Sequence, residues 1–274
     1  FEGTGLFETI FTRILLEVDT CGFLDTESLF IDGTHIKANA NPHKHKNEIY
    51  QKEARCYEKE LQEEIEKDRK AHGKKSLKEN QKEPEELTRK VSTTDADSGW
   101  FHKGEHKQVF AYGVNTCCDR NNYILDFEVV PGNVHDSVSF WALYKRLRQN
   151  WKYGTYYVMD GGYKIPAITR RLIEDEKKPI MPYKRPVTKE GFFKKYEYVY
   201  DEYYDCYICP NNKILHYSTT NREGYREYKS DWLVCKLCPH RKQCTESKDY
   251  IKVVTRHVWE TYMEQTEDLR YTLG

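Results

Sequence analysis

Two aspartates stand where an apolar, strand-like run of residues ends. Asp32 closes "LFID" and Asp160 closes "YYVMD", and a glycine follows each of them. A turn or a helix cap would explain one such aspartate. Two carboxylates a few Å apart repel each other, and a shared proton or a divalent cation relieves that repulsion. Oxygen ligands favour Mg²⁺ or Mn²⁺ over zinc, and a pair of such ions supports phosphoryl transfer.

Cysteines form a second set of candidate ligands. Their spacing is C-x₂-C-x₂₅-C-x₂-C-x₅-C, and it is formed by Cys206, Cys209, Cys235, Cys238 and Cys244. Two C-x₂-C pairs can hold one tetrahedral Zn²⁺, and four thiolates leave no open position for a catalytic water. We therefore expect structural zinc, with Cys244 or His240 as a substitute for one of the first four ligands. Reduced, unligated thiols are the alternative.

The elements that must position these residues can be predicted from their periodicity. Residues 4–18 have helical spacing, 28–33 form a strand, and the charged run 46–90 indicates an exposed helix. Residues 108–118 and 123–130 indicate a hairpin, followed by a helix that Asp136 or Ser137 begins as the cap. A strand at 155–160, a helix at 164–175 and a strand at 179–182 complete the pattern. This order predicts an α/β fold with a mixed sheet flanked by helices.

The composition limits which partners the chain can have. It has 274 residues, 32% of them charged, and a formal net charge of zero. The charge as a whole therefore does not indicate a nucleic-acid partner, and any such contact must come from local patches. The stretch "YKRPVTKEGFFKKYEYVY" at 183–200 interleaves bases with aromatic rings, which suits a phosphate backbone and unpaired bases. A solvated loop whose tyrosines pack a small module is the alternative.

Several separated motifs, in order along the chain, resemble those of bacterial insertion-sequence transposases of the DDE type. The motifs are "LFIDGTHIKANAN", "STTDADSGWFHKGEHKQVFAYGVNTCCD", "VVPGNVHDS" and "VMDGGYKIPAITRRL". The resemblance is to the branch with an RNase H-like catalytic core and a cysteine-rich insertion. It implies Asp32 as the first catalytic acid and Asp160 as the second. Asn133, His135 and Asp136 match a similar patch of the family, although a strand exit and helix cap also explain them.

The resemblance also implies a third acid, a glutamate on a helix that follows the cysteine-rich insertion. The sequence has no segment that matches this helix, and we expect a catalytic core that is cut at both ends. If the third acid lies within residues 1–274, Asp136 and Glu260 are the first candidates. Metals at the acidic site would be Mg²⁺ or Mn²⁺, coordinated by Asp32 and Asp160.

The predicted domains follow from the motifs and from the change in composition near Tyr183. Residues 1–27 lead by a helix into the core, residues 28–183 form the RNase H-like core with a helical insertion at 46–90, and residues 184–274 hold the zinc-ribbon-like cysteine module and the start of a helix. Bases expected to contact DNA are Lys37, Lys107, Lys164, Lys184 and Arg185.

The resemblance implies Mg²⁺-dependent cleavage and strand transfer of an insertion sequence. The expected partners are transposon ends, target DNA and a second copy of the chain, in a bacterial cytoplasm at the nucleoid. No apolar run approaches the ~20 residues of a membrane span. Two rival functions remain open: a nuclease on the same scaffold, and a catalytically silent DNA-binding remnant.

Overall fold

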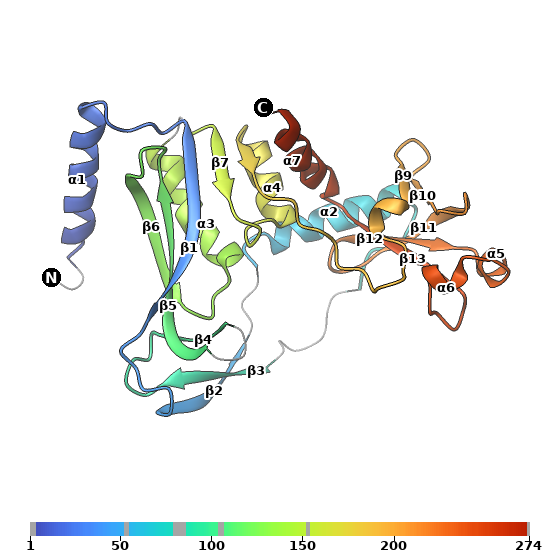
Figure 1. The fold of residues 1–274 in the computed structure, drawn as a ribbon, viewed down its shortest axis with the longest axis horizontal. Coiled ribbons are helices and arrows are strands. Elements are labelled where there is room, and N and C mark those ends of the chain that lie inside the picture. The colour runs from blue at the N-terminus through green and yellow to red at the C-terminus, as the bar shows by residue number, and fades with distance from the viewer. Residues whose placement is uncertain (1–3, 52–54, 79–85, 104–106, 152–153, 273–274) are drawn as a thin grey trace. The chain divides into compact units, whose positions relative to one another are not determined.

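A mixed sheet organises the first of the two units into which the chain divides. The computed structural model describes residues 4–51, 55–78, 86–103, 107–151 and 154–272. The first unit comprises residues 1–55, 82–182 and 262–274, and the second comprises residues 56–81 and 183–261. Figure 1 shows the elements of both.

The first unit contains the strands that carry the two aspartates. Its strands run in the spatial order β2-β3-β4-β5-β1-β7-β8, and β6 pairs with β5. Their bounds are Ser28–Lys37 (β1), His45–Gln51 (β2), Glu86–Ser92 (β3), Gly99–Lys103 (β4), Lys107–Cys118 (β5), Ile124–Pro131 (β6), Tyr156–Met159 (β7) and Lys178–Ile180 (β8).

Five of these strands form the centre of an RNase H-like fold. β5 pairs antiparallel with β1 and β6, whereas β1, β7 and β8 run parallel. Parallel neighbours need crossover connections, and helices supply them. They are α3 (Asp136–Asn150) between β6 and β7 and α4 (Pro166–Glu174) between β7 and β8. The prediction of a mixed sheet flanked by helices is confirmed.

The core of this unit lies between the sheet and α3. Leu29 and Ile31 of β1 and Phe140 and Leu143 of α3 are at most 2% exposed and belong to one apolar cluster. Helix α1 (Leu6–Thr20) contributes Leu15 to it. Because alternate residues of a strand face opposite sides, the burial of Ile31 leaves its neighbour Asp32 on the other face of β1.

The charged run 46–90 differs from its prediction as one exposed helix. It does contain a helix, α2 (Glu58–Ala71), but strands β2 and β3 enclose that helix and pair antiparallel from His45↔Ser92 to Gln51↔Glu86. Helix α2 contributes to the second unit, whereas both strands belong to the first. Charges dominate β2 and β3, so the alternation that reveals a half-buried strand is weak there.

The second unit is built on a five-stranded antiparallel sheet in the order β13-β12-β11-β10-β9. Tyr198, Tyr207, Leu215, Tyr228 and Val254 form its buried cluster. The elements are η1 (Lys195–Glu197), β9 (Val199–Asp201), β10 (Cys206–Ile208), β11 (Ile214–Thr220), β12 (Tyr225–Ser230), α5 (Trp232–Lys236), α6 (Arg241–Cys244) and β13 (Val253–His257). Helix α7 (Glu260–Thr272) begins in this unit, and its residues from Tyr262 onward belong to the first.

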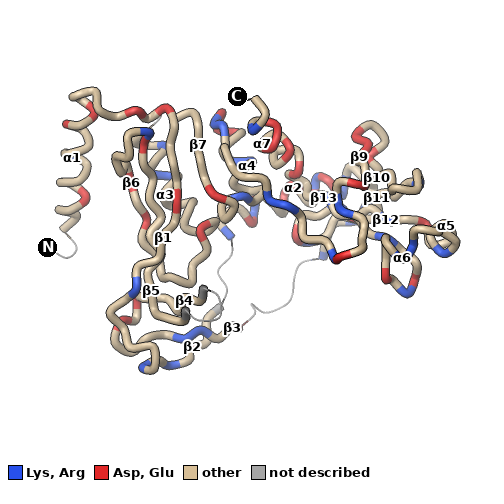
Figure 2. The backbone as a smooth tube through the Cα atoms, viewed as in Figure 1, with Lys and Arg blue, Asp and Glu red and all other residues tan. Residues whose placement is uncertain are grey.

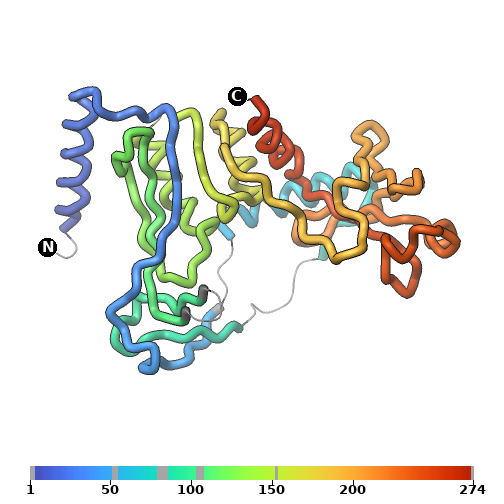
Figure 3. The backbone as a smooth tube through the Cα atoms, viewed as in Figure 1, coloured from blue at the N-terminus to red at the C-terminus, as the bar shows by residue number. Residues whose placement is uncertain are grey.

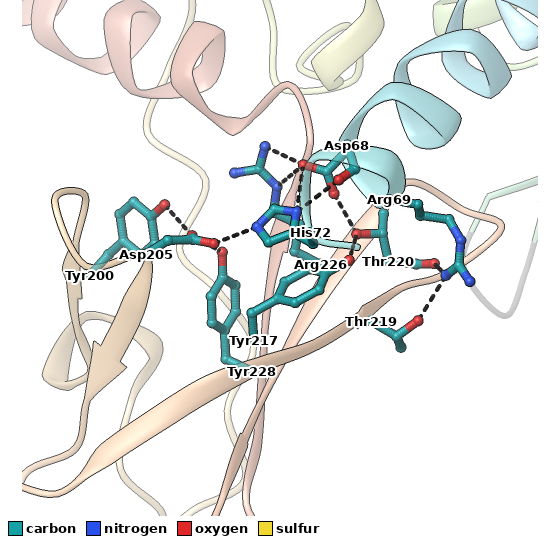
Figure 4. Close-up of polar contacts among 10 residues, drawn as sticks. All are labelled: Asp68, Arg69, His72, Tyr200, Asp205, Tyr217, Thr219, Thr220, Arg226 and Tyr228. Atoms are coloured by element: carbon teal, nitrogen blue, oxygen red, sulfur yellow. Dashed lines mark hydrogen bonds and ion pairs between the residues drawn. The ribbon is translucent and has the colours of Figure 1, made fainter. Parts of the chain in front are cut away.

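Helix α2 packs on this sheet although it lies more than a hundred residues earlier in the chain. In Figure 3, the helix has the cyan colour of an early segment and lies beside strands in the orange of late segments. The contact centres on Asp68, which is 5% exposed. Its carboxylate accepts hydrogen bonds from the Arg226 guanidinium at 2.6–2.7 Å and from the Thr220 hydroxyl at 2.5 Å (Figure 4). A buried charge that is both paired and hydrogen-bonded is tolerated, so this contact fixes the helix on the sheet.

A second carboxylate extends the network. Asp205 interacts with the His72 ring at 2.7 Å and accepts hydrogen bonds from the hydroxyls of Tyr200 and Tyr228 at 2.7 and 2.6 Å (Figure 4). The His72 ring also stacks on Tyr217, with ring centroids 3.8 Å apart. These bonds lower the pKa of Asp205, although burial opposes them. The fold of the second unit therefore depends on contacts between its two chain segments, 56–81 and 183–261.

Replacing Asp68 with Asn should destabilise the second unit by about 3 kcal/mol, because the partly buried Arg226 charge loses its carboxylate partner. Denaturant unfolding of the purified protein would measure the loss. Glu63→Gln removes an exposed carboxylate from the same helix and should change stability by less than about 0.5 kcal/mol. Equal stability of the two variants would show that the Asp68 network does not hold the helix.

Candidate active site

The pairing of β1 with β7 places Asp32 and Asp160 at neighbouring positions. The two strands run parallel with Ile31 opposite Met159, and each aspartate is the next residue. Both side chains are exposed. The N–H of Gly33 donates to Asp32 at 2.8 Å, and the N–H of Gly162 donates to Asp160 at 2.7 Å. Asp160 follows the last residue of β7, whereas Asp32 lies inside β1, which continues to Lys37 and is longer than the predicted strand 28–33. The two aspartates are therefore neighbours across the β1–β7 pairing.

Asp136, the first residue of α3, is the third carboxylate at this place. A Cβ atom on Gly33 would lie 2.7 Å from one Asp136 oxygen, and a Cβ atom on Gly162 would lie 3.2 Å from the other. Only a residue without a side chain allows the carboxylate so near both backbones. We call Asp32, Asp136 and Asp160 the acid cluster.

The shift in the pKa of Asp136 agrees with the close approach of the three carboxylates. Burial raises the pKa of the Asp136 carboxyl, and the Asp160 and Asp32 carboxylates add to the rise, whereas His135 and His35 oppose it. Within the described residues, none of the three acids forms an ion pair with a lysine or arginine. The acid cluster therefore has negative charge that no lysine or arginine of the described residues balances, and a bound cation would balance it.

A buried pair of polar residues forms the floor of the acid cluster. Asn115 of β5 lies opposite Gly33 in the register and is 1% exposed, and the Tyr163 hydroxyl donates a hydrogen bond to its side-chain oxygen. Burial raises the pKa of Tyr163, and the carboxylates of the acid cluster raise it further. Sequence reasoning missed both residues, although an asparagine inside an apolar strand was a usable signal.

The start of α3 corrects the predicted cap. His135, rather than Asp136 or Ser137, is the N-cap, and its ring nitrogen accepts a hydrogen bond from the Ser137 N–H at 3.2 Å. Because His135 caps the helix, the Asp136 carboxylate is free to turn toward the acid cluster.

The other acid candidates have different partners. Glu260 lies in the second unit and pairs with Lys195 at 2.8 Å. Glu267 of α7 pairs with Lys164 and with Arg270, and these bonds lower its pKa although burial opposes them. Neither glutamate belongs to the acid cluster.

The bases expected to contact DNA differ in their exposure. Lys37, Lys184 and Arg185 are exposed, and the side chain of Lys107 lies outside the described residues. Lys164 corrects the prediction, because it is 5% exposed and its ammonium is bound to Glu267 and to the Pro182 carbonyl. Figure 2 shows acidic and basic residues interspersed along the backbone, without a large region of one sign.

The predicted zinc ligands do not all lie together. Cys206 is buried, and its neighbours Tyr207 and Cys209 pack on the apolar cluster of the second unit. Since alternate residues of β10 face opposite sides, Cys206 points away from that cluster and should not join the other thiols. Burial and the carboxylates of Asp201 and Asp205 raise its pKa.

The other four cysteines have contacts in common with one turn and with one another. The Cys209 sulfur accepts a hydrogen bond from the Lys213 N–H at 3.4 Å, and the Cys238 sulfur accepts one from the Asn211 side chain of the same turn at 3.6 Å. Burial raises the pKa of Cys244, and its thiol neighbours Cys235 and Cys209 add to the rise. Within the described residues, however, no group of three or more His, Cys, Asp or Glu side chains is arranged to hold a metal ion, and this applies to the acid cluster as well as to the cysteines.

Comparison with known proteins gives two family matches. A family model described as "Transposase DDE domain" matches residues 24–228, and a second model of the same description matches residues 208–272. The first includes all three acids of the acid cluster. No curated protein and no solved structure matched the chain. None of the described helices is long and apolar enough to cross a membrane.

Replacing Asp32 or Asp160 with Asn should weaken Mn²⁺ binding at least about tenfold, because loss of a direct ligand should cost no less than loss of a group that orients one. Mn²⁺ titration followed by electron paramagnetic resonance would measure the affinity. Asp19→Asn, an exposed change at the end of α1, should leave it unchanged. Identical affinities in all four proteins would remove the metal role from the acid cluster.

Proposed function

Because this chain belongs to the transposase DDE domain family, we propose that it cleaves and joins DNA strands with divalent metal ions held by Asp32 and Asp160. The observation that carries the proposal is the β1–β7 register, which makes Asp32 and Asp160 neighbours across the two strands. The ions would be Mg²⁺ or Mn²⁺, as suits exposed carboxylate oxygens. When bound, they would stabilise charge on the oxygens that attack and leave phosphorus.

The acid cluster fits such ions in its donor chemistry. Asp32 and Asp160 each use one oxygen to accept a backbone N–H, so the other oxygen remains for a cation. Asp136 brings a third carboxylate to the same place from α3, and Gly33 and Gly162 provide the space for it. We propose Asp136 as a positioning residue that adds negative charge beside the two ligands.

The substrate of the proposed reaction is a DNA phosphodiester. Exposed bases on both units, Lys37 in the first and Lys184 and Arg185 in the second, are proposed contacts to its phosphates. Transposon ends and target DNA would both bind at the acid cluster, in a complex of two copies of the chain. The proposal places the protein at the bacterial nucleoid.

Cleavage and joining can be tested separately. Full-length protein with Mg²⁺ should nick DNA that contains the transposon end and should join a pre-cut end to target DNA. Asp160→Asn should lower both rates at least about a thousandfold while leaving DNA binding intact, since in-line displacement depends on metal-held oxygens.

Two results would favour the rival functions. Nicking without joining of the pre-cut end would indicate a nuclease on this scaffold. DNA binding with neither reaction, in wild-type protein that binds Mn²⁺, would indicate a silent DNA-binding remnant. Asp126→Asn, which removes a partner of Arg146 away from the acid cluster, serves as the control and should retain both reactions.

We also propose that Cys209, Cys235, Cys238 and Cys244 hold one structural Zn²⁺. Support comes from the hydrogen bonds to the Cys209 and Cys238 sulfurs and from the proximity of Cys244 to Cys235 and Cys209. Four thiolates are the ligand set of closed structural sites. Zinc would then cross-link the 209–213 turn to α5 and α6.

Metal analysis of the purified protein should find about one zinc per chain. The Cys244→Ser variant should contain no zinc. The Cys206→Ser variant should retain its zinc, because Cys206 lies on the face of β10 that points away from the apolar cluster. Loss of zinc in Cys206→Ser with retention in Cys244→Ser would reverse the proposed assignment. Wild-type protein without zinc would indicate reduced, unligated thiols.

A further inference from the structure

A cavity of about 340 Å³ lies directly beside the acid cluster. We call it the β4 pocket. It lies within the first unit, between β4 and the loop that joins β6 to α3. Asp136 belongs both to its wall and to the acid cluster, so the pocket borders the proposed reaction site. Its other polar and aromatic lining residues include His35, Phe101, His102, Asn133 and His135.

Stacked rings form one wall of the β4 pocket. The rings of His35 and Phe101 have centroids 3.7 Å apart and an interplanar angle of 19°. In the strand registers, His35 lies opposite Gly113 and Phe101 opposite Val109 of the same strand, β5. The His35 ring nitrogen bonds the Gly132 carbonyl at 3.2 Å, which ties the stack to the loop.

The loop side of the pocket is also fixed. A Cβ atom on Gly99 would lie 2.1 Å from the Asn133 side-chain oxygen and 2.7 Å from the Asn133 backbone nitrogen. Only glycine permits this approach, and it holds the loop against β4. The Trp100 ring packs on buried Phe110, with centroids 4.9 Å apart, and anchors the same strand from the opposite face. The walls of the pocket are therefore set by the backbone.

A second cavity, of about 390 Å³, shares Asn133 with the β4 pocket. Arg89 and Lys90 of β3 line it, together with one carboxylate, Asp97. A path thus runs from the acid cluster past aromatic and amide groups toward β3, where Arg89 pairs with Glu48 at 3.5 Å and the Lys90 ammonium lies 4.5 Å from the centroid of the Trp100 ring. This order of groups matches a nucleic-acid strand, in which phosphates alternate with bases that have a flat face and polar edges.

We propose that the β4 pocket takes one unpaired nucleobase of the DNA strand whose phosphate lies at the acid cluster. This inference rests on the proposed function and goes beyond it by assigning the neighbouring nucleotide a site. The base stacks against the Phe101–His35 pair, and Asn133 meets its polar edge. The next phosphate along the strand lies toward Arg89 and Lys90. A base inside a duplex cannot enter such a pocket, so the strand must be unpaired at this position.

Fluorescence of 2-aminopurine tests the assignment, because this base is quenched when it stacks. The DNA has a duplex part and a single-stranded overhang, with 2-aminopurine at successive positions across the junction. Ca²⁺ replaces Mg²⁺ so that the DNA is bound without being cut. Wild-type protein should quench the probe at one or two adjacent positions only.

Phe101→Leu and His35→Leu each remove one ring of the stack. Both variants should lose the position-specific quenching. Their affinity for the overhang DNA should fall about tenfold, as expected for the loss of one base stack. Both should bind fully paired DNA as the wild type does. An abasic nucleotide at the quenched position should make the wild type and the variants bind equally. Tyr123→Leu, an exposed ring in the β5–β6 turn, is the control and should change nothing.

Four results would overturn the inference. Equal quenching at all positions, or ring variants that bind overhang DNA as tightly as the wild type, would exclude a base in the pocket while leaving the proposed function intact. Equally tight binding of free 2-aminopurine nucleotide would indicate a nucleotide site instead. Wild-type protein that binds no DNA would contradict the proposed function as well. Thermal unfolding of each variant identifies any loss that comes from misfolding.

Discussion

The parallel pairing of β1 with β7 is the constraint on which the candidate site depends. It sets Ile31 beside Met159 in the core and, one residue later, turns Asp32 and Asp160 outward as neighbours. The same register that buries the apolar residues therefore produces the repulsion between the acids. A slip of one residue would bury a carboxylate and expose an apolar side chain, so core packing maintains the site geometry.

Much of the first unit could be predicted because its strands and helices have strong periodicity. The β5–β6 hairpin, α3 and the β7–α4–β8 crossover all show the patterns expected of them. Strands β2 and β3 could not be predicted, because they are mainly polar and lie within a highly charged run, and because their pairing joins segments on either side of α2. The union of α2 with the later sheet depends on Asp68, Arg226 and Thr220, and no local pattern reveals contacts so distant in the chain.

The candidate site was predictable only in part, for similar reasons. Asp32 and Asp160 could be found because each follows a short apolar run, although only Asp160 lies at the end of its strand and β1 continues beyond Asp32 to Lys37. Asp136 has the same local context as an ordinary helix start, and only the close approach of Gly33 and Gly162 distinguishes it. Among the cysteines, spacing alone could not separate Cys206 from Cys209, since Cys206 lies within β10 whereas Cys209 lies in the turn that follows the strand.

The two carboxylate centres of the protein show how structural and functional acids differ. Asp68 and Asp205 are surrounded by a guanidinium, hydroxyls and an imidazole, so their charges are balanced within the fold. The acid cluster has backbone N–H groups and a raised pKa at Asp136, but no lysine or arginine partner within the described residues. Folding gains nothing from three uncompensated carboxylates at one place. Their arrangement is explained if the balancing charge comes from outside the chain, and the proposed function assigns that charge to a divalent cation at a DNA phosphate.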